Sequence, residues 1–470
     1  MNLPLLALLA LPFLAAPLAY PLRRTPLAAP LAAITAGLML GLLWGVPWPR
    51  VAAGPDQITL GAPVVVLGRT IRLTEADRWA LTALWGVAAL AFLTAWPFPF
   101  ERRLYPIGLT AAGLWTAGLL IRPVSLGAFP IGSAALLLAL TVLGEGHGMG
   151  GAMSYLIAAS LGVLLWTTAA WAAEQAGLNP GQPLWTLLTP TLILLALALW
   201  LGVWPAHRWA PLLLGEGAPV GGAFTLFLLH AGTWLWLPAW IQSFPWLALS
   251  PLWTLGLQAI GAVMVLSSAA LALPETGWGR LGGYGWLASS GLSWLALGLG
   301  TAEGIHLSAW SMGIRVIPLL GMAFALAAYR RMARSTAFGQ VPLAQGPWVI
   351  ALLLGSGLAL VDAPPFPGFA GRWALLRLLL PGRPGLALAL IAVTGAMGWT
   401  FLRGLVAASA AERPLRPMPR PARWFGLAWW TAQGVLWLAA PWLGSWLEPL
   451  TAGWTRALLG GFATPPAPWP

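Results

Sequence analysis

Apolar stretches long enough to cross a lipid bilayer follow one another along almost the whole chain, separated by short clusters of arginine, proline and glycine. A helix needs roughly 20 apolar residues to span about 30 Å of hydrocarbon, and only helices and closed barrels satisfy their backbone groups there. The stretches do not alternate as barrel strands do. Composition agrees, since 59% of the residues are hydrophobic and 8% are charged. The sequence therefore predicts an all-α integral membrane protein.

The lengths of these stretches and the breaks between them predict about fourteen transmembrane helices in a single transmembrane domain, residues 1–470. The expected spans lie near residues 3–20, 28–48, 79–98, 106–122, 125–144, 152–175, 184–204, 220–243, 251–273, 281–300, 305–328, 347–378, 384–408 and 423–446. The segment 50–78 does not fit a span, and its pattern predicts a small external strand hairpin.

The charge distribution predicts the orientation of the helices. A net charge of +12 would suggest nucleic acid as a partner of a soluble chain, but these arginines lie in short loops between apolar stretches. We therefore expect a lipid bilayer and no nucleic acid. The loops after the first, third, eleventh and thirteenth spans hold 11 of the 24 arginines, whereas most even-numbered loops hold few, which predicts that the arginine-rich loops are cytoplasmic. With an even number of spans, both termini are then expected to be extracytoplasmic.

Several kinds of chemistry are excluded or disfavoured by the residues present. The chain has no cysteine, which excludes disulfides and thiolate ligands, and its four histidines are far apart. No metal site is therefore expected. No phosphate-binding glycine loop, haem ligand pair or catalytic triad pattern is found. We expect this chain alone to bind no cofactor and to catalyse no redox reaction.

Two apolar stretches are broken by proline and followed by a cation and a tryptophan. They are LWLGVWPAHRWAP, residues 199–211, and DAPPFPGFAGRW, residues 362–373. Interrupted helices at comparable places in two halves point to a transporter built from repeats, with its ion path at the breaks. Prolines that merely end helices at a membrane surface give the same pattern. Spacing alone leaves both interpretations open.

An ordered set of motifs carries a more specific resemblance. WPAHRWAP is followed by EGAPVGGAF (216–224), GRLGGYGWLASSG (279–291) and DAPPFPGFAGRW. In this order they resemble the antiporter-like membrane subunits of respiratory complex I, a superfamily that includes multisubunit sodium/proton antiporters and membrane-bound hydrogenases. The resemblance covers roughly residues 80–410, and the chain length favours the N-type or M-type subunit.

The resemblance implies a particular architecture and set of partners. It implies two inverted five-helix repeats, 106–245 and 250–410, each with a broken helix. N-terminal helices, 1–105, and a C-terminal helix and tail, 411–470, flank them. It further implies buried ionisable groups that pass protons, other membrane-arm subunits as partners, and a prokaryotic plasma membrane as the location.

The chain departs from the family at the proton-path positions. By the resemblance, Phe129 stands in place of a glutamate, and Ser154 and Trp200 stand in place of lysines. Arg315 and Arg372 occupy places where family members have lysine, and all 24 of the chain's lysine-or-arginine residues are arginine. A buried lysine can lose its proton, whereas arginine stays protonated. Phenylalanine and tryptophan carry no exchangeable charge at all, so the family's first half-channel is expected to be dismantled here.

The remaining candidates for a proton path each allow two interpretations. His230, in the middle of a span, either carries protons or is a neutral imidazole bonded to a neighbouring helix. His207 either carries protons or makes a structural hydrogen bond. Glu303 and His306, three positions apart, form either an uptake relay or part of a solvated loop. Asp362 either pairs with Arg372 across the proline break or caps a helix end in water.

Three functions follow from these observations and stay open. The chain is expected to be a membrane-arm subunit of a complex I-like oxidoreductase that passes electrons from NADH or another donor to quinone. In that assembly it either contributes to proton translocation by an altered or reduced path or serves as a non-pumping scaffold. Alternatively it is a subunit of a cation/proton antiporter. The scarcity of protonatable groups in the predicted spans favours the scaffold over unaltered pumping.

Overall fold

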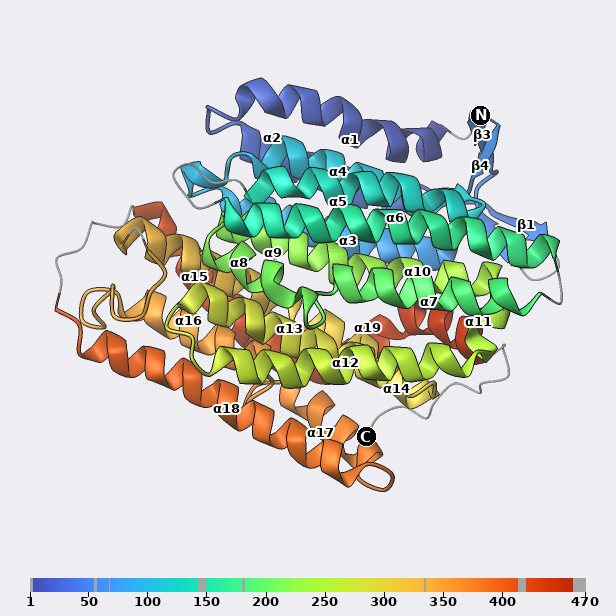
Figure 1. Cartoon of the computed structure of the whole chain (residues 1–470). Coiled ribbons are helices and arrows are strands. Elements are labelled where there is room, and N and C mark those ends of the chain that lie inside the picture. The colour runs from blue at the N-terminus through green and yellow to red at the C-terminus, as the bar shows by residue number, and fades with distance from the viewer. Residues whose placement is uncertain are drawn as a thin grey trace.

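The computed structural model describes residues 3–54, 57–66, 68–142, 149–179, 182–333, 335–412 and 420–459. Helices run side by side along the long dimension of the molecule, and the N-terminus and the strands lie at the same end (Figure 1). The unbroken helices are α1 (Leu3–Leu22), α2 (Ala28–Gly45), α3 (Glu75–Ala95), α4 (Leu104–Leu120), α5 (Ala128–Val142), α6 (Gly150–Leu178), α11 (Trp246–Leu249), α12 (Pro251–Ala272), α13 (Trp278–Leu297), α18 (Pro384–Ser409) and α19 (Arg420–Leu459).

Within the described ranges, ten helical segments are long and apolar enough to cross a bilayer. Each expected span corresponds to one helix or to consecutive helices, which confirms the prediction of an all-α integral membrane fold. The last helix, α19, is longer than its expected span because it begins at Arg420 and continues to Leu459. Pro441 and Pro449 do not end it, although proline in a helix interior removes a backbone donor.

Both predicted broken helices are present. The first consists of α7 (Pro183–Trp200), a short 3₁₀ turn (Ala206–Arg208) and α8 (Trp209–Gly215). The second consists of α16 (Pro347–Leu360) and α17 (Gly368–Leu379). Non-helical backbone of this kind is tolerated at membrane depth only where protein or water satisfies it. The breaks are therefore places where polar groups must be accounted for.

Two further helices are interrupted where the sequence predicted continuous spans. The expected span 305–328 is divided into α14 (Ala302–Ile314) and α15 (Val316–Ala333), with Arg315 at the junction. The expected span 220–243 comprises α9 (Pro219–Phe227), a π-helical turn (Leu228–Gly232) and α10 (Thr233–Ser243). Single π-turns inside helices occur frequently at functional sites. Both interruptions hold a candidate residue, Arg315 in one and His230 in the other.

The segment 50–78 and its surroundings are more elaborate than the single predicted hairpin. One antiparallel pair joins β1 (Arg50–Gly54) to β2 (Gln57–Leu60). A second joins β3 (Val64–Val66) to β4 (Arg69–Ile71), and β4 also pairs with β5 (Ile121–Arg122) from the end of α4. The Arg122 guanidinium lies 3.3 Å from the Asp77 carboxylate at the start of α3. The long-range β4–β5 pairing could not be read from the alternation within 50–78.

Helix α13 forms the centre of the second half. All its residues except Arg280 are buried, which is the pattern of a helix surrounded by other helices. It packs closely on α12, since a Cβ on Gly261 would lie 2.4 Å from the Leu295 backbone nitrogen. Small residues allow such close backbone approach within membranes. This packing places the polar side chains of α13 in the interior.

Candidate functional site

The two helix breaks share one backbone geometry. Gly202 has φ +67° and Asp362 has φ +52°, so each break turns through the left-handed region. The next residue then donates its N–H to a carbonyl five positions back: Val203 to Ala198 at 2.8 Å, and Ala363 to Leu358 at 3.0 Å. Left-handed backbone is unstrained for glycine and unusual for other residues. Asp362 therefore occupies a position that, by backbone geometry alone, a glycine would fill.

The interior of the first break is aromatic. Trp200, at the end of α7, is buried, and its indole N–H donates to the Ala159 carbonyl at 3.3 Å. The Trp166 ring lies 6.0 Å from the Trp200 ring and 4.8 Å from that of Trp236. A Cβ on Gly162 would lie 2.1 Å from the Trp200 indole nitrogen, so glycine makes room for this ring. The position that the resemblance assigns to a lysine is thus filled by packed indoles.

The second break contains a buried ion pair. Asp362 and Arg315 are 0% and 2% exposed. Arg315 Nε donates to Asp362 Oδ1 at 3.2 Å, and Nη2 donates to Oδ2 at 2.5 Å. Arg315 Nη1 donates to the Ser293 hydroxyl at 3.0 Å and to the Ser289 carbonyl. This two-pronged geometry and the additional acceptors are what a buried pair needs to offset the loss of hydration.

The expected partner of Asp362 was wrong. The sequence suggested Arg372 or water, but Asp362 is fully buried and its hydrogen-bonded ion pair is with Arg315. Arg372, also buried, donates to the Val361 carbonyl at 2.6 Å and to the Thr394 hydroxyl. The left-handed backbone at Asp362 directs its side chain to the α14–α15 junction, whereas Arg372 follows on α17. Arg372 thereby satisfies a carbonyl that the end of α16 leaves without a helical partner.

His230 lies in the π-helical turn and is completely buried. Its ring is 6.1 Å from that of Trp209 on α8 and 5.8 Å from that of Trp286 on α13. Neither imidazole nitrogen has a hydrogen-bond partner among the described residues. The hydroxyls of Thr233, three residues further along the chain, and of Ser290 on α13 are also buried without a partner among the described residues. Buried polar atoms of this kind are normally satisfied by ordered water.

Helix α13 connects the surroundings of His230 with the ion pair. Trp286 contacts His230, while the carbonyl of Ser289 and the hydroxyl of Ser293 accept hydrogen bonds from Arg315. Residues three, four and seven positions apart lie on one face of a helix. One face of α13 therefore carries Trp286, Ser289, Ser290 and Ser293 from the histidine to the arginine. All four residues of this row are buried, and three of them carry a side-chain hydroxyl.

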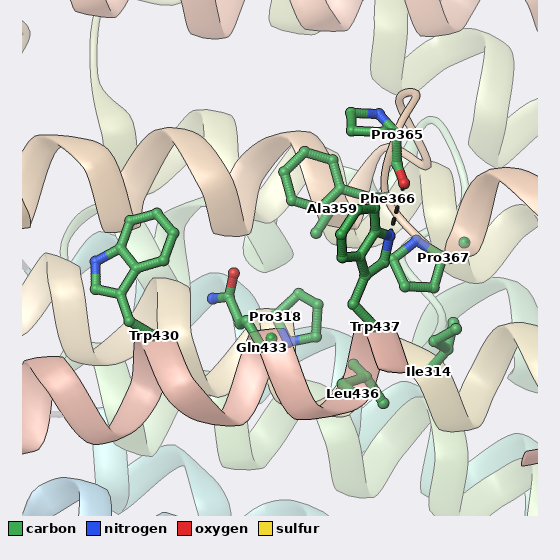
Figure 2. A pocket seen from close by; sticks show the side chains of 12 residues that line it. Ile314, Pro318, Ala359, Pro365, Phe366, Pro367, Trp430, Gln433, Leu436 and Trp437 are labelled. Atoms are coloured by element: carbon green, nitrogen blue, oxygen red, sulfur yellow. Dashed lines mark hydrogen bonds between the residues drawn. The ribbon is translucent and has the colours of Figure 1, made fainter. Parts of the chain in front are cut away.

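A half-open apolar cavity of about 210 Å³ lies beside the second break. Figure 2 shows Trp437 of α19 on one wall, with its indole N–H donating to the Pro365 carbonyl at 2.8 Å. The cavity walls adjoin the ion pair, because Ile314 precedes Arg315 and Gly368 packs on Asp362. A Cβ on Gly368 would lie 2.0 Å from Asp362 Oδ1. Only glycine fits there without moving the carboxylate.

The other predicted residues lie apart from this row. His207 is half-buried at the first break, with its ring 6.2 Å from that of Tyr284. Glu303 is exposed in the first turn of α14, and His306, half-buried one turn later, is within electrostatic range of Glu448 on α19. No described hydrogen bond joins Glu303 to His306. The relay predicted from their spacing therefore remains a prediction.

Phe129 and Ser154, which stand at proton-path positions of the family by the resemblance, lie in different surroundings from each other. Phe129 is 73% exposed at the start of α5, so it lies on the outside of the chain rather than in its interior. Ser154 is half-buried on α6. Neither residue belongs to the row between His230 and Arg315.

Sequence reasoning missed several residues around the charges. Ser289 and Ser293 bind Arg315, and Thr394 binds Arg372, but isolated serines and threonines in apolar spans give no distinguishing signal. Arg330 was expected in a cytoplasmic loop. It is 6% exposed and donates to backbone carbonyls at the end of α8. Across the described chain, no group of three or more histidine and carboxylate side chains is arranged to hold a metal ion.

Comparison with solved structures shows which known chains share this fold. The fold matches a chain of the Mrp complex from Dietzia sp. DQ12-45-1b with a TM-score of 0.74 at 15% identity, over 98% of each chain. It matches a chain of respiratory complex I from Thermus thermophilus with a TM-score of 0.73 at 18% identity, over 97% of this chain and 99% of that one. A chain of an archaeal membrane-bound sulfane sulfur reductase gives 0.72. The chain thus shares the fold of membrane chains from these multisubunit complexes.

Two sequence relatives share one name. NADH-quinone oxidoreductase subunit N of Rhodopseudomonas palustris (strain BisA53) is 28% identical over 397 residues, 79% of this chain and 82% of that protein. The subunit of the same name from Desulfovibrio desulfuricans is 29% identical over 202 residues, and the match spans 39% of its length. No protein-family model matches the sequence. These findings support the resemblance to the complex I membrane subunits.

Proposed function

We propose that this chain is a membrane-arm subunit of a complex I-like quinone oxidoreductase and contributes to proton translocation through its second half. The observation that carries the proposal is the row from His230 along α13 to the buried Arg315–Asp362 pair. Ionisable groups inside a membrane are costly and by default mark ion or proton paths. The relatives named NADH-quinone oxidoreductase subunit N support the assembly.

The groups of this row have different chemical abilities. Arginine stays protonated in proteins, so Arg315 holds a fixed positive charge and Asp362 is its counter-ion. Imidazole is the side chain that exchanges protons near neutral pH. His230 is therefore proposed as the proton carrier, with water bridging to the unpartnered hydroxyls of Thr233 and Ser290. The fixed charges set the local field in which that proton moves.

A second function, a scaffold without translocation, is favoured by the first half of the chain. There, packed indoles of Trp166, Trp200 and Trp236 fill the region around the first break. Indole cannot donate its proton and take up another as a relay, since Trp is a donor only. Under either function the partners proposed are the other membrane-arm subunits, and the arginine-rich loops are proposed to face the cytoplasm, with both termini on the opposite side.

The deciding measurement is the number of protons pumped per electron in membrane vesicles that contain the assembled complex. The variant is His230→Gln, and His207→Gln is the matched control, because His207 lies at the first break outside the row. Assembly is checked in all samples by recovery of the intact complex. We expect a lower ratio for His230→Gln at equal electron transfer and an unchanged ratio for His207→Gln.

The opposite result would select the scaffold. An unchanged ratio for an assembled His230→Gln complex contradicts the proposed carrier role. A translocation activity that requires sodium would instead select an antiporter subunit, the function suggested by the fold shared with the Mrp complex.

A further inference from the structure

Glu101, in the connection between α3 and α4, caps a helix that begins more than a hundred residues later. Its Oε1 accepts the Val220 N–H at 2.9 Å, and its Oε2 accepts the Gly221 N–H at 3.1 Å. These are the first free N–H groups of α9, because the helix starts with Pro219, which has none. The side chain of the preceding residue, Ala218, does not cap them. Glu101 therefore performs the capping function from a distant part of the chain.

This carboxylate is buried among groups that act on it in opposite directions. Glu101 is 1% exposed, and burial raises its pKa to about 7 even though the two N–H groups and the positive charge of Arg330 lower it. Arg330 reaches this region from α15 and donates to the carbonyls of Leu214 and Gly215 at 3.1 and 2.6 Å. Of the other ionisable neighbours, Tyr105 comes from α4 and Arg102 from the same connection.

Protonation of Glu101 must change its bonds to α9. Each carboxylate oxygen accepts one backbone N–H, so a proton added to either oxygen is carried by an atom that is bonded to the first turn of α9. The N–H groups of the first turn of α9 then bond to a neutral carboxyl group, which is a weaker acceptor than a carboxylate. The attraction to Arg330 is lost at the same time. Helix α9 runs directly into the π-helical turn that holds His230.

We propose that Glu101 is a proton-exchanging residue whose charge state controls how the first turn of α9 fits against the α3–α4 connection. The proton comes from water at the arginine-rich end of the bundle, where Arg103, two residues on, is exposed. The carboxylate becomes a neutral carboxyl group on uptake and returns the proton to the same water on release. This inference deepens the proposed function by adding a titrating group at that end, but it is tested without reference to pumping.

The test is a pH titration of the purified full-length chain followed by infrared difference spectroscopy of the protonated carboxyl group. We expect a carboxyl carbonyl signal that disappears with a midpoint of about pH 7. The signal should be absent in Glu101→Gln and retained in Glu216→Gln. Glu216 is the matched control because it follows α8, is less buried, and pairs with Arg280 at 3.1 Å. Glu101→Asp should keep a signal with a shifted midpoint.

Two results would overturn the proposal. The first is a signal of unchanged midpoint in Glu101→Gln, which would assign the titration to another group. The second is a wild-type protein with no carboxyl titrating between about pH 5 and 9, a range wide enough to include a displaced midpoint. Neither depends on translocation, and His230→Gln is expected to leave the signal intact, so failure of this inference is distinguishable from failure of the proposed function.

Stability provides an independent readout of the same group. A carboxyl whose pKa is higher in the folded than in the unfolded chain binds more protons when folded, so its contribution to stability falls as pH rises from about 4.5 to 7. The wild-type unfolding temperature should therefore decline over this interval by a component that Glu101→Gln lacks. Parallel declines in the two proteins would count against a titrating Glu101.

Discussion

The two helix breaks have nearly the same backbone and opposite interiors. Each contains a residue with positive φ followed by an N–H that reaches a carbonyl five positions back. At the first break the residue is Gly202, and packed tryptophans surround it. At the second it is Asp362, and its carboxylate is held by Arg315. The comparison shows that a helix break supplies a place for polar chemistry, whereas the side chains of neighbouring helices decide whether that place is used.

The two breaks also differ in the free-energy cost of their buried groups. The first break needs no compensation beyond the backbone bonds, since glycine has no side chain to bury. At the second, two charges are removed from water and remain only because Arg315 also binds Ser289 and Ser293. Replacing a buried pair by apolar residues is often neutral, while removing one partner is strongly destabilising. The second break is therefore expected to be more sensitive to substitution.

The largest effect is expected from Asp362→Gly, which places the residue of the first break in the second. It introduces no backbone strain but leaves the Arg315 charge buried without its counter-ion. The free energy of unfolding in detergent should fall by about 3–5 kcal/mol. The double variant Asp362→Gly, Arg315→Leu should recover much of this loss. A single variant that unfolds like the wild type would contradict the energetic role of the pair.

Arg372→Ala is expected to have the next largest effect. The change removes the donors to Val361 and Thr394 and leaves the Val361 carbonyl unsatisfied at membrane depth. A loss of about 1–3 kcal/mol and a lower yield of assembled complex should follow. Arg377→Ala is the control on the same helix, because Arg377 is exposed. Equal yields for the two variants would show that the buried bonds of Arg372 do not stabilise the break.

Gly202→Ala tests the first break by its backbone alone. The added Cβ would lie 3.3 Å from Leu287 Cδ2, so the main cost is the left-handed conformation. We expect a loss of about 1–2 kcal/mol of unfolding free energy. Gly395→Ala in α18 has open space around its Cβ and should instead be neutral or stabilising by up to about 1 kcal/mol. If both substitutions raise the free energy of unfolding, residue 202 does not adopt the left-handed conformation in the folded protein.

The smallest effect is expected from Trp437→Phe. It removes the indole donor to the Pro365 carbonyl but keeps an aromatic ring against the cavity. Because Trp437 is 53% exposed, the free energy of unfolding should fall by no more than about 0.5–1.5 kcal/mol when this bond is lost. Trp430→Phe, at the same cavity, is the control. A loss as large as that of Asp362→Gly would mean that α19 holds the break together more strongly than the ion pair does.

Much of the fold could be predicted from the sequence because apolar length is a local property. About 30 Å of hydrocarbon requires a continuous apolar helix, so each span is encoded within its own residues. The prolines at 205 and 365 likewise placed both breaks. The interruption at Arg315 could not be predicted in this way, since an arginine inside an apolar stretch only becomes tolerable when a partner from another helix reaches it.

The candidate site was also predicted only in part. The sequence identified Arg315, Asp362, Arg372 and His230 as unusual, because polar residues inside apolar spans are costly wherever they point. It offered water or the arginine that is near in sequence as the partner of Asp362, while the structure pairs Asp362 with an arginine 47 positions away. The bond from Glu101 to α9 spans 119 positions and left no local signal.

By itself, then, the sequence determined that this chain crosses a bilayer many times, where its two principal breaks lie, and that the charges inside its apolar spans must be buried. Only the tertiary structure decided which buried charge meets which, that indoles pack around the first break, and that α13 connects the histidine to the ion pair. Hydrophobic burial in a membrane depends on the composition of each segment alone. Hydrogen bonds and ion pairs act over about 3 Å between segments far apart in the chain, so their partners are fixed only when the helices pack.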